Sequence, residues 1–190
     1  MPPDSDLATL YQSAVRLHAR ELFNYAYRLC GRRDLAEDLV QETFLHAWRS
    51  LSGLRDAEKI RPWLYRILRR RYARMIRYRW FGRLAQLEVR FPIPAAKDSS
   101  IESIDQRETL QAALDKLDNR FKQPFLMVYQ EGLSCQDTAA QLQVPLGTVL
   151  SRIFRARKML RDTISENSTY RNSQSRSAST VSNLQRREVL

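Results

Sequence analysis

Glycine and proline are scarce in this chain of 190 residues, which has five glycines and seven prolines. Sandwiches and barrels need many turn residues between short strands, so the shortage favours helices. Cysteine is rarer still. Cys30 and Cys135 are far apart and no C-x-x-C pair occurs, which argues against a zinc site and a secreted disulfide scaffold. We interpret both as reduced, partly buried thiols and expect no metal or other cofactor.

Long apolar runs are also missing. No segment approaches the ~18–20 consecutive apolar residues of a membrane span. The first ten residues, MPPDSDLATL, lack the basic start and apolar run of a secretory signal. We therefore expect a soluble cytoplasmic protein that does not insert into a membrane.

Acidic residues are outnumbered by basic ones. The chain has 32 Lys+Arg against 21 Asp+Glu, which gives a formal net charge of +11. A balance this basic favours a polyanionic partner, either nucleic acid or an anionic membrane surface. Hydrophobic residues make up 43%, so a buried core is possible.

Periodic and aperiodic stretches divide the chain into four parts. Residues 7–81 and 105–164 have apolar residues at helical spacing. Residues 82–104 lack this spacing and contain Pro92 and Pro94. Residues 165–190 hold seven serines, four arginines and few apolar residues, which predicts a disordered tail. We therefore predict an all-α protein in which a flexible linker joins two small helical domains.

The second domain contains a helix-turn-helix pattern, EGLSCQDTAAQLQVPLGTVLSRIFRARKMLR, over residues 131–161. Gly132 is suited to end the preceding helix, and Val144-Pro145 makes the turn before a basic last helix. In this motif the start of the second helix meets base edges in the major groove. The candidate DNA-binding residues are Thr148, Leu150, Ser151, Arg152, Arg155 and Lys158. A helical hairpin that binds protein is the alternative.

In the first domain, residues 34–51 combine acidic and amide side chains with large apolar ones at helical spacing. By itself, an ordinary solvated helix face would explain the polar residues. An acidic cluster flanked by large apolar groups in a very basic protein suits docking onto a protein better than contact with phosphate.

The segment 61–83 has the opposite character, with nine arginines and no acid. Leu64, Leu68, Tyr72 and Met75 form its apolar face, and Arg66, Arg70, Arg74 and Arg77 lie opposite. Trp63, Tyr65, Tyr78 and Trp80 are interleaved with the arginines. Arginines contact phosphate and aromatic rings stack on unpaired bases, so this helix could hold opened DNA. A basic helix on a membrane surface is the rival interpretation.

Three motifs together resemble the bacterial RNA polymerase sigma factors of the extracytoplasmic-function (ECF) class. They are DLAEDLVQETFLHAW, RPWLYRI and GLSCQDTAAQLQVPLGTVLSRIFRAR, in this order, and the similarity covers about residues 10–164. The resemblance implies a subunit that directs core RNA polymerase to promoter DNA and supports its opening. Members of the class are commonly held by an anti-sigma factor, although no pattern here identifies one.

The resemblance also assigns roles to the segments. Residues 34–51 look like the part of sigma region 2 that grips the polymerase clamp, through Asp38, Gln41, Glu42, Phe44 and Trp48. Residues 52–81 look like the part that melts and reads the minus-ten element, through Trp63, Arg66, Arg70, Arg74 and Arg77. Residues 110–164 look like region 4, which reads the minus-thirty-five element.

Two positions depart from the family pattern. Arg70 stands where the family usually has asparagine, which puts base selection at the minus-ten element in doubt. Leu150 stands where a polar or basic residue is common. Leucine cannot donate a hydrogen bond to a base but can touch a thymine methyl, so we predict an altered upstream promoter preference.

Two other function classes remain as alternatives. A stand-alone helix-turn-helix regulator would bind DNA without polymerase, but it would not require the acidic face at 34–51. An enzyme is disfavoured, because the chain has only two histidines, His18 and His46, and no metal-ligand cluster, glycine-rich phosphate loop or nucleophile motif.

Overall fold

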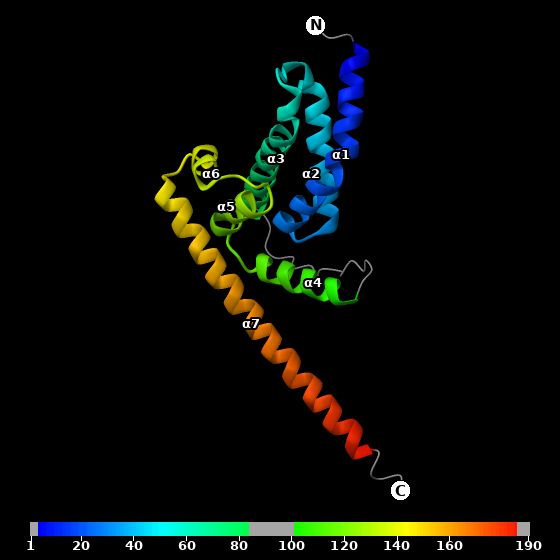
Figure 1. The fold of residues 1–190 in the computed structure, drawn as a ribbon, viewed down its shortest axis with the longest axis vertical. Coiled ribbons are helices and arrows are strands. Elements are labelled where there is room, and N and C mark those ends of the chain that lie inside the picture. The colour runs from blue at the N-terminus through cyan, green and yellow to red at the C-terminus, as the bar shows by residue number, and fades with distance from the viewer. Residues whose placement is uncertain (1–3, 84–100, 186–190) are drawn as a thin grey trace. The chain divides into compact units, whose positions relative to one another are not determined.

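The computed structural model describes the backbone of residues 4–83 and 101–185, and the side chains of residues 6–77 and 107–165. Within these ranges the chain is helical and has no strand, which confirms the all-α prediction (Figure 1). The α-helices are α1 (Asp4–Cys30), α2 (Arg33–Ser50), α3 (Ile60–Arg83), α4 (Ile101–Asp115), α5 (Asn119–Tyr129), α6 (Cys135–Leu142) and α7 (Leu146–Gln185). Two 3-10 turns, η1 (Leu51–Gly53) and η2 (Ala57–Lys59), connect α2 to α3.

The described chain forms two compact units, which confirms the prediction of two helical domains. Of the described residues, the first unit comprises 4–83 together with Leu126–Ser134, and the second comprises 101–125 and 135–185. The segment Leu126–Ser134, which includes the last turn of α5, groups with the first unit, although the residues on both sides of it belong to the second.

In the first unit, α1, α2 and α3 pack against one another as a three-helix bundle (Figure 1). Their buried residues recur every three or four positions, the spacing that places side chains on one helix face. The fully or nearly fully buried side chains are Leu22, Tyr25, Ala26 and Leu29 on α1, Ala36, Leu39 and Ala47 on α2, and Leu64, Leu68 and Tyr72 on α3. The predicted apolar face of α3 is thus confirmed, with Met75 half-buried at its end.

Two buried hydroxyl groups in this bundle have backbone partners. The Thr43 hydroxyl donates to the Leu39 carbonyl at 2.7 Å, one turn back in α2. The Tyr72 hydroxyl donates to the Leu29 carbonyl at 3.1 Å and so satisfies an acceptor in the last turn of α1. Gly31 then ends α1 at a positive φ of 69°, a conformation that costs glycine little.

In the second unit, α7 packs against α4 and α6. Val149, Ile153, Ala156 and Leu160 on α7 are buried. Ala113 and Leu114 from α4, Leu117 just after that helix and Ala139 from α6 complete the core with Phe121.

The ends of two predicted segments differ from the structure. Helix α7 continues to Gln185, although the sequence predicted a disordered tail from residue 165. No glycine or proline follows Gly147, so nothing in the backbone chemistry stops the helix. The predicted linker 82–104 lies mostly outside the described residues, and its two ends belong to α3 and α4.

Candidate nucleic-acid and protein interfaces

The solvent-facing side of α2 carries most of the residues predicted to bind polymerase. Asp38, Gln41, Glu42 and Trp48 are exposed and recur at helical spacing. Trp48 is 50% exposed, a large value for so large an apolar side chain. Phe44 differs from the prediction in its placement, because it is only 7% exposed and packs inside the bundle. It can support this face from beneath but cannot form much of its surface.

Helix α1 adds an aromatic residue to this face that the sequence analysis did not identify. The Tyr11 ring lies edge-on to Trp48, with 4.9 Å between ring centroids, and its hydroxyl is 3.4 Å from the Phe44 carbonyl. Tyr11, Trp48 and Leu45, with Ala8 and Gln12, line an open hollow of about 300 Å³. Leu45 shares the helical spacing of Gln41 and Trp48 and could have been found from sequence. Tyr11 could not, because its position depends on how α1 packs on α2.

The acidic residues of this face are available to a partner. Within the part of the chain whose side chains are described, ion pairs on α2 join Arg32 to Asp34 and Arg33 to Glu37, near its start. Neither Asp38 nor Glu42 is in an ion pair there. The face therefore combines an exposed aromatic hollow, a feature enriched at protein interfaces, with uncompensated negative charge that suits a basic partner surface.

Helix α3 carries the predicted DNA-binding arginines on its exposed side. Arg66, Arg70, Arg74 and Arg77 are exposed, and Trp63 is half-buried one turn before them. The spacing of these five residues places them along one stripe of the helix. The side chains of Tyr78 and Trp80 lie outside the described residues.

Tyr65 does not fit the expected role of a base-stacking ring. It is 1% exposed, and its ring meets Tyr25 edge-on with 5.0 Å between centroids. The Arg61 guanidinium lies 5.1 Å from its centroid. Burial, with a smaller effect of the Glu21 carboxylate, raises the pKa of the Tyr65 phenol to about 12. Tyr65 is thus part of the core, and its spacing from the arginines in sequence was misleading.

Two arginines of α3 also point away from the exposed stripe. Arg69 is 7% exposed and pairs with Glu131. Arg61 contacts the Glu21 carboxylate, with 3.2 Å between Nε and each carboxylate oxygen. The nine arginines of residues 61–83 therefore do not act as one set, and at least these two are engaged within the protein.

In the second unit, α6 and α7 form the predicted helix-turn-helix. The turn is closed by bonds from the Val144 amide to the Ala139 carbonyl at 3.1 Å and from the Thr148 amide to the Pro145 carbonyl at 2.9 Å. Gln143 adopts a positive φ of 55° between them. The turn fixes where α7 begins and which of its sides faces the core.

The predicted base-reading residues lie on the uncovered sides of α7. Leu150, Ser151, Arg155 and Lys158 are exposed, whereas Thr148 and Arg152 are half-buried. The Ser151 hydroxyl donates to the Thr148 carbonyl at 2.9 Å, so it is left mainly as an acceptor. Phe154, which the sequence analysis passed over, is 70% exposed and lies one turn beyond Leu150. This side of α7 is therefore more apolar than the sequence analysis supposed.

Comparisons with known proteins agree with this architecture. The Sigma-70 region 2 family matches residues 14–81, and the Sigma-70 region 4 family matches residues 107–160. Among characterised proteins, the ECF RNA polymerase sigma factor SigL of Mycobacterium tuberculosis is 32% identical over 166 residues, which cover 84% of this chain and 91% of SigL. The chain belongs to the ECF RNA polymerase sigma factors. SigE of Mycolicibacterium smegmatis is 38% identical over 163 residues, which cover 84% of this chain and 63% of SigE.

A solved structure also resembles this sigma factor. The sigma factor RpoE from Bartonella quintana, in complex with the anti-sigma factor NepR, is 26% identical with a TM-score of 0.67. The match covers 82% of this chain and 96% of that one. The α2 and α3 faces described above lie within region 2, and the helix-turn-helix lies within region 4.

No other kind of site emerges from the described side chains. Residues 6–77 and 107–165 contain no group of three or more His, Cys, Asp or Glu that could hold a metal ion. In the same part of the chain, no helix is both long and apolar enough to cross a membrane.

Proposed function

We propose that this sigma factor directs core RNA polymerase to specific promoters and supports promoter opening, as a specificity subunit without catalysis of its own. One observation carries the proposal. Two neighbouring helices of region 2 present exposed faces of opposite character, acidic and aromatic on α2 and arginine-rich on α3. A protein that bound only DNA would have no use for the α2 face.

Each face has a distinct task in this proposal. Asp38, Glu42 and Trp48 on α2, with Tyr11 beside them, bind core polymerase. The α3 stripe, from Trp63 to Arg77, holds the opened minus-ten region by phosphate contacts and by stacking. The start of α7 reads the minus-thirty-five element in the major groove.

Further partners and the place of action follow from the same role. The chain acts in the cytoplasm, where polymerase and promoter DNA are found. The related RpoE was solved in complex with an anti-sigma factor, and we propose that an anti-sigma factor also binds this chain.

Run-off transcription with core polymerase on fragments of the source genome tests the proposal and yields the promoter. We expect defined transcripts only when the sigma factor is added, and permanganate-reactive thymines near each start site. Duplex binding that needs no polymerase, with neither transcripts nor reactive thymines, would instead indicate a stand-alone regulator.

A further inference from the structure

Helices α1 and α2 of the first unit lie side by side and run in opposite directions (Figure 1). Near the start of α1, the Tyr11 ring meets Trp48 near the end of α2, with 4.9 Å between centroids. Further along α1, the Phe23 ring meets Arg33 at the start of α2, with 5.9 Å between its centroid and the guanidinium carbon. One seam between the two helices therefore runs from Tyr11 to Phe23.

The end of the seam at Phe23 is occupied by contacts within the protein. Phe23 stacks on Tyr27, with 6.3 Å between centroids and 15° between ring planes. Arg33, which covers Phe23, donates from Nε to the Glu37 carboxylate at 2.8 Å. The charges of Arg33 and Glu37 thus compensate each other at this end.

The other half of the seam carries an arginine beside the aromatic hollow. Gln12 of α1 lines that hollow with Leu45 and Trp48, and Arg16 is exposed one turn later. Residues four apart share a helix face and are about 6 Å apart along its axis, so Arg16 borders the hollow on its α1 side. No ion pair joins Arg16 to another of the described side chains.

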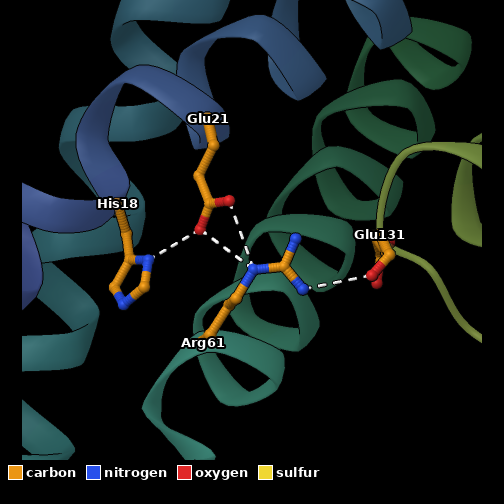
Figure 2. A network of polar contacts seen from close by, with 4 residues as sticks. All are labelled: His18, Glu21, Arg61 and Glu131. Carbon is orange, nitrogen blue, oxygen red and sulfur yellow. Dashed lines mark hydrogen bonds and ion pairs between the residues drawn. The ribbon is translucent and has the colours of Figure 1, made fainter.

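The acid of α1 nearest to Arg16 in sequence is engaged elsewhere. Glu21 is the only acidic residue between positions 7 and 30. Its carboxylate accepts from Arg61 Nε of α3 at 3.2 Å and lies 2.6 Å from His18 Nδ1 (Figure 2). Glu21 is therefore turned towards α3, and Arg16 leaves a positive charge at the seam.

The far side of the hollow has the opposite charge. Asp38 and Glu42 are exposed on α2, and helical spacing places them beyond Trp48 and Leu45, away from α1. The hollow thus lies between a positive flank on α1 and a negative flank on α2. Because the two flanks differ in sign, a charged partner satisfies both of them in one orientation only.

We infer that Arg16 belongs to the polymerase-binding face, and that core polymerase presents an acidic group opposite Arg16 and basic groups opposite Asp38 and Glu42. The inference rests on the proposed function, because that proposal gives the adjoining hollow to polymerase. Continuity with the hollow assigns Arg16 to the same partner. Trp48 supplies apolar burial at the centre, and the two flanks orient polymerase during association.

The rate at which the full-length protein associates with immobilised core polymerase tests the inference. Charges at the rim of an interface act mainly on association, so Arg16→Glu should associate about tenfold more slowly at low salt, with little change in dissociation. Arg16→Lys keeps the charge and should associate as the wild type does. Lys116→Glu makes the same charge change at an exposed position of the second unit and is the matched control. Equal rates for Arg16→Glu and Lys116→Glu would overturn the inference.

A charge exchange tests the polarity of the two flanks. Arg16→Glu with Asp38→Lys removes two units of charge and adds two, so the formal net charge remains +11. This double variant should nevertheless associate more slowly than either single variant. The difference should shrink at about 1 M salt, where the screening length falls to about 3 Å. If the exchange restores the wild-type rate, polymerase does not read the polarity and the inference is wrong.

The same proteins separate this inference from the proposed function. If the wild type binds core polymerase and supports transcription while Arg16→Glu associates at the wild-type rate, the inference fails alone. If the wild type does not bind core polymerase, the inference fails together with the proposed function. If Arg16→Glu associates normally but the preformed holoenzyme loses affinity for promoter DNA, Arg16 contacts DNA and the inference is overturned.

Discussion

At the scale of single residues, Leu150 stands out because this apolar side chain is 51% exposed near the start of α7. The exposed Phe154 follows it one turn later, so an apolar strip lies on the side of α7 that we propose enters the major groove. Apolar side chains favour thymine methyls over hydrogen-bonding base edges. The strip is therefore the physical basis of the predicted upstream preference.

Replacing Leu150 with arginine should change that preference. Arginine can make two hydrogen bonds to guanine, so selection from a randomised promoter library should shift from thymine to guanine at one minus-thirty-five position. Each good contact discriminates by about 1–3 kcal/mol, or about 5- to 150-fold. Met159→Arg, a change at another exposed apolar residue of α7, serves as control. Identical preferences for Leu150→Arg and wild type would refute the assignment.

Tyr65 leads to a prediction about alkaline stability. Its folded pKa is raised from 10.0 to about 12, so the folded chain keeps the phenol proton where the unfolded chain has lost it. This stabilisation is complete below pH 10 and is lost as the pH rises towards 12. The loss is about 2–3 kcal/mol. Urea unfolding at intervals across this range should show a smaller loss for Tyr65→Phe, and equal losses in both proteins would contradict the account.

At the scale of elements, the exposed face of α2 should depend on its aromatic centre. Trp48→Ala removes the ring that Tyr11 and Leu45 surround, and a central aromatic residue of an interface typically contributes about 2 kcal/mol or more. We therefore expect core polymerase to bind about thirtyfold more weakly, as measured by calorimetry, with the helicity retained. Leu17→Ala alters a side chain of α1 that is 73% exposed and should have little effect. Equal effects of the two changes would argue against the assignment of this face.

Helices and their buried faces could be predicted from sequence because the information is local. The spacing of Leu64, Leu68 and Tyr72 alone indicates one buried stripe, and the structure buries all three. The pairing of Arg69 with Glu131 could not be predicted, since 62 positions separate them and an arginine among arginines suggests a solvent-facing role. The predicted stacking role of Tyr65 was wrong for a similar reason, because only the packing of α1 on α3 shows that Tyr25 covers its ring.

At the scale of the whole molecule, the net charge of +11 and its placement govern DNA binding. Each arginine that neutralises a phosphate releases counterions, so affinity falls as salt rises, and the slope of log K against log salt counts such contacts. Removal of one contact lowers the slope by about 1. We therefore expect holoenzyme with Arg70→Ala to bind a promoter more weakly at low salt and with a slope reduced by about 1.

The control variant is Arg20→Ala, because Arg20 is exposed and belongs to α1 rather than to the arginine stripe of α3. It removes the same total charge, and the long-range field of the molecule falls equally in both variants. If only the total charge matters, the two slopes will be equal. If the α3 stripe contacts phosphates, as we propose, Arg70→Ala alone will lower the slope. Fluorescence anisotropy on one promoter fragment at five or more salt concentrations decides between these outcomes.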